Sequence, residues 1–90
     1  MSGGHFHYSP SNLTDIAYDI REQIKSGEWE WRAETVEELW RAVEAVEKAR
    51  IYIHRVDYLL SGDDSEDSFR VRLGRNLEDF ERSYNTERRG

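Results

Sequence analysis

The sequence predicts an all-α protein, and three observations support this fold class. Apolar residues repeat at intervals of three and four in three separate segments, which is the spacing of an amphipathic helix. Gly27 and Gly62 separate these segments, and the only proline, Pro10, precedes the first of them. The chain has 90 residues, the length of one domain. We therefore expect a three-helix antiparallel bundle, or a helical hairpin with an added helix, organised around a long central helix.

The expected elements divide a single domain, residues 1–90. They are an ordered N-terminal arm over 1–10, helices over about 12–26, 35–60 and 65–84, and a frayed polar tail over 85–90.

The arm carries four ring residues in a row, His5, Phe6, His7 and Tyr8. In an extended chain, alternate side chains point to opposite sides, so Phe6 and Tyr8 share one side. We expect that side to lie on a hydrophobic surface of this chain or of a partner. The two histidines, with the aspartates at 63–64, offer the nitrogen and oxygen ligands that bind zinc. Packed histidines explain the same pattern, and we predict neither a metal nor another cofactor.

The first helix is expected to begin after Ser11 or Asn12, both of which are good N-caps, and to end at Gly27. Its apolar face is formed by Leu13, Ile16, Ala17, Ile20 and Ile24.

The connection that follows contains two tryptophans, Trp29 and Trp31, which alternate with glutamates. One interpretation is that a tryptophan covers the end of the bundle as a lid on the core, since aromatic residues dominate core burial. The other is an exposed platform that stacks on a base or clamps a partner.

The central helix is expected to begin at Thr35, because Thr35 and Glu38 have the spacing of a capping box. It continues to about Leu60 without an internal glycine or proline. Two apolar stripes run along it, which indicates two packing neighbours. Because a small chain gains stability from oligomerisation, we expect a homodimer or a higher homo-oligomer.

Polar residues interrupt this apolar pattern at Arg50, His54, Arg55 and Asp57. A buried charge costs free energy unless it is paired. One interpretation is an ion pair, within the chain or across a dimer, that fixes helix register. The other is a pocket in which Arg50 and Arg55 bind an anion.

The third helix follows a turn in which Gly62 takes a left-handed conformation and Asp64 or Ser65 caps the helix. Gly74 lies inside the helix at a cost of ~1 kcal/mol relative to alanine, and we expect another backbone to approach it closely. The residues expected in the core of the whole protein are Leu13, Ile16, Ile20, Ile24, Leu39, Val43, Val46, Ile53, Phe69, Leu73, Leu77 and Phe80.

The composition excludes several classes of function. The net charge of −6 disfavours general binding to nucleic acid, which needs a basic surface. Cysteine is absent, so disulfides and thiolate metal sites are excluded. No apolar run is long enough to span a membrane and no signal peptide is recognisable, so we expect the cytoplasm. Eleven arginines against two lysines favour recognition of a carboxylate or phosphate.

Two pairs of glutamates, Glu44 with Glu47 and Glu78 with Glu81, lie one helical turn apart. Such pairs resemble the magnesium-binding motifs of all-α nucleotide pyrophosphatases. In a chain in which 36% of the residues are charged, such pairs arise by chance, and we expect ordinary charge pairs on a solvated helix face here.

Two segments resemble those of a family of small, uncharacterised phage and prophage proteins. The first is Met-Ser-Gly-Gly-His-Phe at 1–6, and the second is Tyr-Ile-His-Arg-Val-Asp-Tyr-Leu-Leu-Ser-Gly-Asp-Asp at 52–64. The resemblance implies a phage accessory protein in the cytoplasm of the host cell. It directs attention to the arm and to Arg55, Asp57, Asp63 and Asp64, and it assigns no catalytic residue.

The predicted function is non-enzymatic. The protein is expected to bind a host protein, such as a defence nuclease, or to sequester a small anionic ligand such as a nucleotide. The alternative is a metal-dependent nucleotide hydrolase that uses Glu44 and Glu47.

Overall fold

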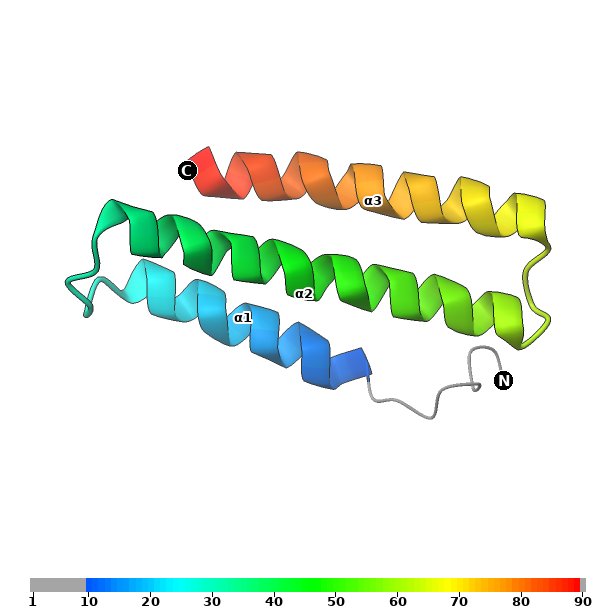
Figure 1. Ribbon diagram of the computed structural model, residues 1–90, viewed down its shortest axis with the longest axis horizontal. Helices are drawn as coiled ribbons and strands as arrows, with labels where there is room; N and C mark the ends of the chain where they lie inside the picture. Colours follow the sequence, from blue (N-terminus) through cyan, green and yellow to red (C-terminus); the bar gives the residue numbers. More distant parts are fainter. Residues whose placement is uncertain (1–9, 90) are drawn as a thin grey trace.

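The computed structural model describes residues 10–89 and confirms the all-α prediction. Three helices make up this part of the chain: α1 (Pro10–Ser26), α2 (Ala33–Leu60) and α3 (Glu66–Arg89). The long helix α2 lies in the middle and runs antiparallel to both neighbours (Figure 1). The molecule measures 48 × 24 × 16 Å along its principal axes, so the three helices form a flat layer.

The start of α2 differs from the prediction. The carbonyl of Arg32, whose backbone is extended, accepts hydrogen bonds from the N–H groups of Thr35 and Val36 at 3.0 and 3.1 Å. Thr35 therefore lies within the first turn of the helix, and the capping box with Glu38 is wrong. No side chain caps this end.

The turn between α2 and α3 follows the prediction closely. Gly62 has a φ of +82°, its N–H bonds to the carbonyl of Leu59, and the N–H of Asp63 bonds to the carbonyl of Tyr58. These bonds are those of a Schellman motif. Ser65 then caps α3, because its Oγ accepts the N–H of Ser68 at 3.2 Å while Ser68 Oγ accepts the N–H of Ser65 at 3.0 Å.

The tail predicted over 85–90 is instead helical as far as Arg89. The Glu87 carboxylate accepts hydrogen bonds from Arg21 Nε at 2.9 Å and Lys25 Nζ at 3.1 Å, both from α1. Arg88 pairs with Glu37 on α2. Because these side chains hold the last turn against both other helices, the end of α3 is not a frayed tail.

The fully buried core is small, and only Val43 of the predicted core residues is fully buried. Trp40 and Tyr84 meet edge to face beside Val43, with ring centroids 6.1 Å apart. Ile16 is 48% exposed, which contradicts its predicted place in the core. The other predicted core residues are partly buried, because a flat layer leaves two faces of α2 uncovered. The remaining buried apolar residues, Ala17 and Ile51, were not on the predicted list.

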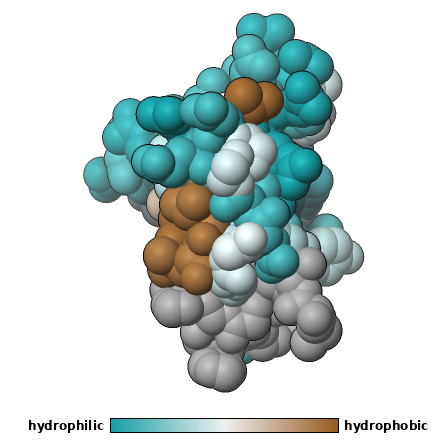
Figure 2. Space-filling view, turned by 90° about the vertical axis from the view of Figure 1, so that its right-hand side faces the viewer, coloured by the Kyte–Doolittle hydropathy of each residue, from teal (hydrophilic) through white to brown (hydrophobic). Residues whose placement is uncertain are grey.

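Apolar groups reach the surface at the end of the molecule where α2 turns into α3 (Figure 2). Leu60 and Val71 are 52% and 58% exposed there. None of the described helices is both long and apolar enough to cross a membrane.

Candidate functional site

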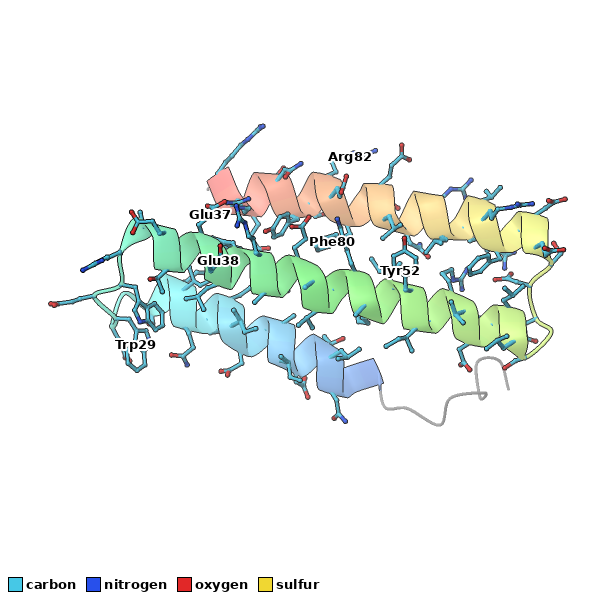
Figure 3. All side chains as sticks on the ribbon, viewed as in Figure 1. Trp29, Glu37, Glu38, Tyr52, Phe80 and Arg82 are labelled. Carbon is cyan, nitrogen blue, oxygen red and sulfur yellow. The ribbon has the colours of Figure 1, made fainter. Side chains whose placement is uncertain are left out.

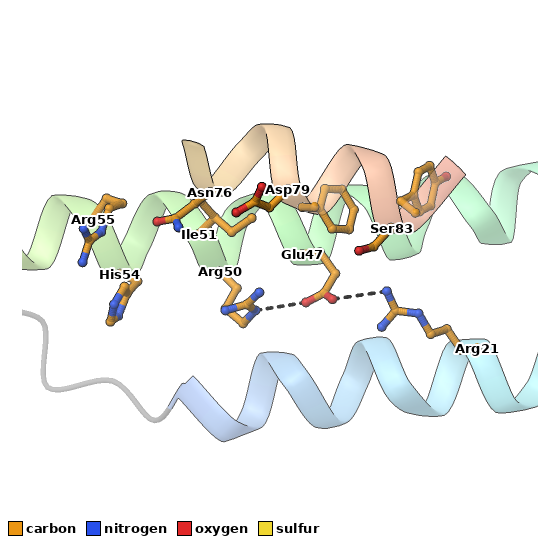
Figure 4. A pocket seen from close by; sticks show the side chains of 11 residues that line it. Arg21, Glu47, Arg50, Ile51, His54, Arg55, Asn76, Asp79 and Ser83 are labelled. Atoms are coloured by element: carbon orange, nitrogen blue, oxygen red, sulfur yellow. Dashed lines mark hydrogen bonds and ion pairs between the residues drawn. The ribbon is translucent and has the colours of Figure 1, made fainter. Parts of the chain in front are cut away.

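A groove of about 550 Å³ crosses the middle of the helical layer (Figure 4). α2 forms most of its floor, one residue of α1 closes one side, and α3 forms the other. The lining residues are Arg21, Glu47, Arg50, Ile51, His54, Arg55, Asn76, Asp79, Phe80, Ser83 and Tyr84.

A carboxylate bridges two arginines on one side of the groove. Glu47 accepts hydrogen bonds from Arg21 Nη2 at 3.2 Å and from Arg50 Nε at 3.0 Å. Glu47 is 13% exposed at its side chain, whereas Arg50 is 33% exposed. The hydrogen bond to Glu47 uses only the Nε of Arg50, so Glu47 does not engage the two terminal nitrogens of this groove-lining guanidinium.

Arg55 supplies a second positive charge, and its pairing is incomplete. The residue is 9% exposed, and Arg55 Nη1 lies 3.8 Å from Asp64 Oδ2, which is too long for a hydrogen bond. Arg55 Nε and Asp64 Oδ2 are both buried without a hydrogen-bond partner in the described chain. The guanidinium also lies over the Tyr58 ring, 4.8 Å from its centroid. A buried guanidinium that lacks full pairing favours an additional anion nearby.

His54 lies between these two arginines along α2. Burial lowers the pKa of His54 below its usual value, and repulsion from Arg55 and Arg50 lowers it further. Its ring packs edge to face against Tyr58, with centroids 4.7 Å apart. The lowered pKa favours the neutral imidazole, which can accept or donate a hydrogen bond without adding charge.

The α3 wall combines polar and aromatic side chains. Asn76 and Ser83 offer hydrogen-bond donors and acceptors, and Phe80 stacks on Tyr84 with centroids 5.3 Å apart. Three arginines and two carboxylates line the groove in a chain whose net charge is −6. The groove is thus locally more positive than the protein as a whole.

The structure brings together some of the predicted site residues and separates others. Arg50 and Arg55 share the groove, whereas Asp57 is buried and Asp63 is exposed in the turn. Asp64 is buried behind Arg55 and does not line the groove. Both tryptophans lie at the α1–α2 connection, and neither is the predicted lid: Trp29 is 52% exposed and Trp31 is 37% exposed. The arm residues His5, Phe6, His7 and Tyr8 lie outside the described residues.

Sequence reasoning missed the contributions of α1 and α3 to the groove. Asn76, Asp79 and Ser83 follow each other at intervals of three and four, so they form a polar stripe beside Phe80 on α3. That polar stripe could have indicated the α3 wall of the groove from the sequence alone. The position of Arg21 could not be predicted in this way, because a single arginine beside an apolar helix face is common.

Three of the four carboxylates in the pairs considered for a hydrolase form ion pairs with cations. Lys48 Nζ lies 3.0 Å from Glu44 and 3.4 Å from Glu81, and Glu47 is held by the two groove arginines. Among the described residues, no three potential metal ligands of the histidine, cysteine or carboxylate type converge.

The chain matches no family model, no curated protein and no solved structure.

Proposed function

We propose that this protein is a non-enzymatic binding protein that holds a small anionic ligand with a planar ring, such as a nucleotide, in the groove. The observation that carries the proposal is Arg55, a groove-lining arginine that is 9% exposed and incompletely paired. Asp64 neutralises the positive charge of Arg55 only in part, and a bound anion beside Arg55 would complete the pairing.

Arg50 supports an anionic group of the phosphate or carboxylate type. Its terminal nitrogens are not used by Glu47, and a guanidinium presents them in the geometry that two oxygens of one anion can accept. Arg50 is also more exposed than Glu47, so a ligand reaches it without displacing the bridge to Arg21.

The α3 wall supports a ring on the same ligand. Phe80 and Ile51 offer an apolar surface, and Asn76 and Ser83 offer hydrogen bonds to the edge of a heterocycle. A few placed polar groups on an apolar surface are typical of small-molecule sites.

The setting that we propose is the cytoplasm of a phage-infected host cell, because two segments of the chain resemble those of small phage proteins. A homo-oligomer remains part of the proposal, because both faces of α2 are incompletely covered in the single chain.

Isothermal titration calorimetry with adenosine monophosphate, inorganic phosphate and adenosine tests the proposal. We expect the nucleotide to bind more tightly than either part, because only the nucleotide has both the anion and the ring. Arg50→Gln removes a charge-assisted hydrogen bond and should weaken nucleotide binding about tenfold or more.

Arg70→Gln is the matched control, since Arg70 also forms an ion pair with a carboxylate three residues earlier but is 70% exposed on α3 and does not line the groove. It should leave binding unchanged. Equal binding by wild type and Arg50→Gln would contradict the proposal. Native mass spectrometry of protein purified directly from cells identifies a ligand other than the probes by its added mass.

A further inference from the structure

The two tryptophans of the α1–α2 connection form a second feature, separate from the groove. Trp29 and Trp31 stack with ring centroids 4.9 Å apart and planes within 9° of parallel. The loop projects beyond the end of the helical layer, and Trp29 marks it in Figure 3. Helix α2 begins at Ala33, directly after this loop, and Glu47 of the groove lies fourteen residues further along it. The start of α2 and Glu47 are therefore about 21 Å apart along the helix axis.

The stacked pair is held in place. Trp29 Nε1 donates a 2.8 Å hydrogen bond to the side chain of Gln23 on α1. Ser26 Oγ accepts the N–H of Glu28 at 3.2 Å, and Gly27 turns the chain with a φ of +69°. Because the rings are already ordered, a partner that binds them does not have to order them first.

The pair is also exposed. Trp29 and Trp31 are 52% and 37% exposed, although tryptophan is among the residues that gain most from burial. Exposed and preorganised aromatic rings of this kind are enriched at the centres of protein–protein interfaces.

The surroundings of the rings are acidic. Residues 27–34 contain three glutamates, Glu28, Glu30 and Glu34, against one arginine, and all of these side chains are exposed. No cation of the described chain forms an ion pair with these three carboxylates. A positively charged partner therefore finds both unpaired carboxylates and the negative face of an indole, which attracts cations.

We propose that the stacked Trp29–Trp31 pair and its flanking glutamates form a docking surface for an arginine- or lysine-bearing segment of a partner protein. A guanidinium stacks on the outer indole face while a neighbouring carboxylate pairs with it. A nucleic acid fits this surface poorly, because its phosphates approach the three glutamates. This surface is independent of the groove, so the two proposals stand or fall separately.

The probe is a peptide of eight residues that alternates arginine with serine, and its matched control replaces each arginine by citrulline, the neutral analogue of the same shape. Titration calorimetry should detect the arginine peptide and not the citrulline peptide. Trp29→Leu keeps an apolar side chain but removes the ring, and we expect the affinity to fall about fivefold. The double variant Glu28→Gln with Glu30→Gln should also bind the arginine peptide more weakly than wild type does, and the loss should be largest at low salt.

Two variants control for general effects. Tyr18→Leu removes another exposed aromatic ring, 62% exposed on α1, and Glu66→Gln combined with Glu78→Gln removes two exposed carboxylates elsewhere. Both should bind the peptide as wild type does. The far-ultraviolet circular dichroism of every variant should match that of wild type, because all the altered side chains are exposed.

Three results would overturn the proposal. The first is equal affinity for the arginine and citrulline peptides, and the second is unchanged affinity in Trp29→Leu. The third is self-association of the wild-type chain, seen as a mass above that of the monomer in sedimentation, that is absent from Trp29→Leu. That result would assign the surface to a second copy of this chain.

Discussion

The hydroxyl of Tyr84 on α3 donates a 2.7 Å hydrogen bond to the backbone carbonyl of Trp40 on α2, inside the small core of the protein. Both residues are buried, and their rings also meet edge to face. Burial raises the pKa of the Tyr84 phenol, so the hydroxyl keeps its proton throughout the neutral range. This contact joins two helices through a buried hydrogen bond that a phenylalanine could not make.

Tyr84→Phe should therefore lower the free energy of unfolding by about 1 kcal/mol, the usual contribution of one hydrogen bond. The ring packing is kept, so the loss reports the hydroxyl alone. Urea denaturation followed by circular dichroism measures it. Tyr18→Phe, at a residue that is 62% exposed, should change stability by less than about 0.5 kcal/mol. An equal effect of both changes would mean that the Tyr84 bond contributes nothing specific.

The two apolar residues Val43 and Ile16 should respond differently to truncation. Val43 is 0% exposed and lies beside Trp40, whereas Ile16 is 48% exposed. Val43→Ala removes buried methyl groups and leaves a cavity, which should cost about 2 kcal/mol. Ile16→Ala should cost less than about 1 kcal/mol, although it removes more atoms. Thermal denaturation of the two variants checks the order, and the reverse order would contradict the core described above.

Gly74 should tolerate a larger side chain. A methyl group built on Gly74 meets nothing within 4 Å, so the predicted close approach of another backbone is wrong. Gly74→Ala should then stabilise the protein by about 1 kcal/mol, because alanine loses less conformational freedom in a helix. Gly62→Ala is the contrasting variant. A methyl group on Gly62 also meets nothing within 4 Å, but the φ of +82° is unfavourable for alanine, so this substitution should destabilise the protein. Urea midpoints measure both.

The sequence predicted the existence, order and orientation of the helices because apolar spacing and turn chemistry are local signals. Gly27 and Gly62 take the left-handed conformation expected of them, and Ser65 caps α3. The ends of helices were harder to predict, because they depend on distant partners. α3 continues past Tyr84 since Glu87 reaches Arg21 and Lys25 on α1, a contact 66 and 62 residues away in sequence.

The candidate site was predictable only in part. Arg50 and Arg55 attracted attention because charges stood within an apolar stripe, a signal that lies within one helix. Their relation to Asn76 and Phe80 depends on how α2 and α3 pack, which spacing along one helix does not reveal. The exposure of Trp29 likewise depends on how the α1–α2 connection lies relative to the helices, which the local sequence does not reveal.

Asp64 should be essential for stability. Its side chain is 0% exposed and accepts hydrogen bonds from Arg72 Nη1 at 2.8 Å and from Ser68 Oγ at 3.2 Å, while Arg55 lies behind it. Asp64→Asn leaves the buried Arg55 without its countercharge and should cost about 3 kcal/mol or more. Asp67→Asn, at an ion pair whose carboxylate is 94% exposed, should change stability by less than about 0.5 kcal/mol. Urea denaturation compares them, and similar small losses would show that Arg55 does not depend on Asp64.

His54 should make the protein less stable as the pH falls. Burial lowers the pKa of His54 in the folded state, repulsion from Arg55 and Arg50 adds to this, and attraction from Asp57 and Asp64 opposes it only in part. Above the unfolded pKa of 6.5, neither state carries the proton and the group has no effect. Below it, the unfolded chain binds a proton that the folded chain does not, so stability is lost until the pH reaches the lowered folded pKa.

The slope of stability against pH isolates this contribution. Urea denaturation at about pH 7.5 and about pH 5.5 spans the window in which an unperturbed histidine gains its proton. We expect the free energy of unfolding of wild type to fall more between the two than that of His54→Gln, which cannot titrate. The comparison concerns slopes, because the variant also loses the ring contact with Tyr58 at every pH. The remaining histidines, His5 and His7, are present in both proteins and cancel. Parallel curves for wild type and His54→Gln would show that the folded protein does not disfavour the charged imidazole at this position.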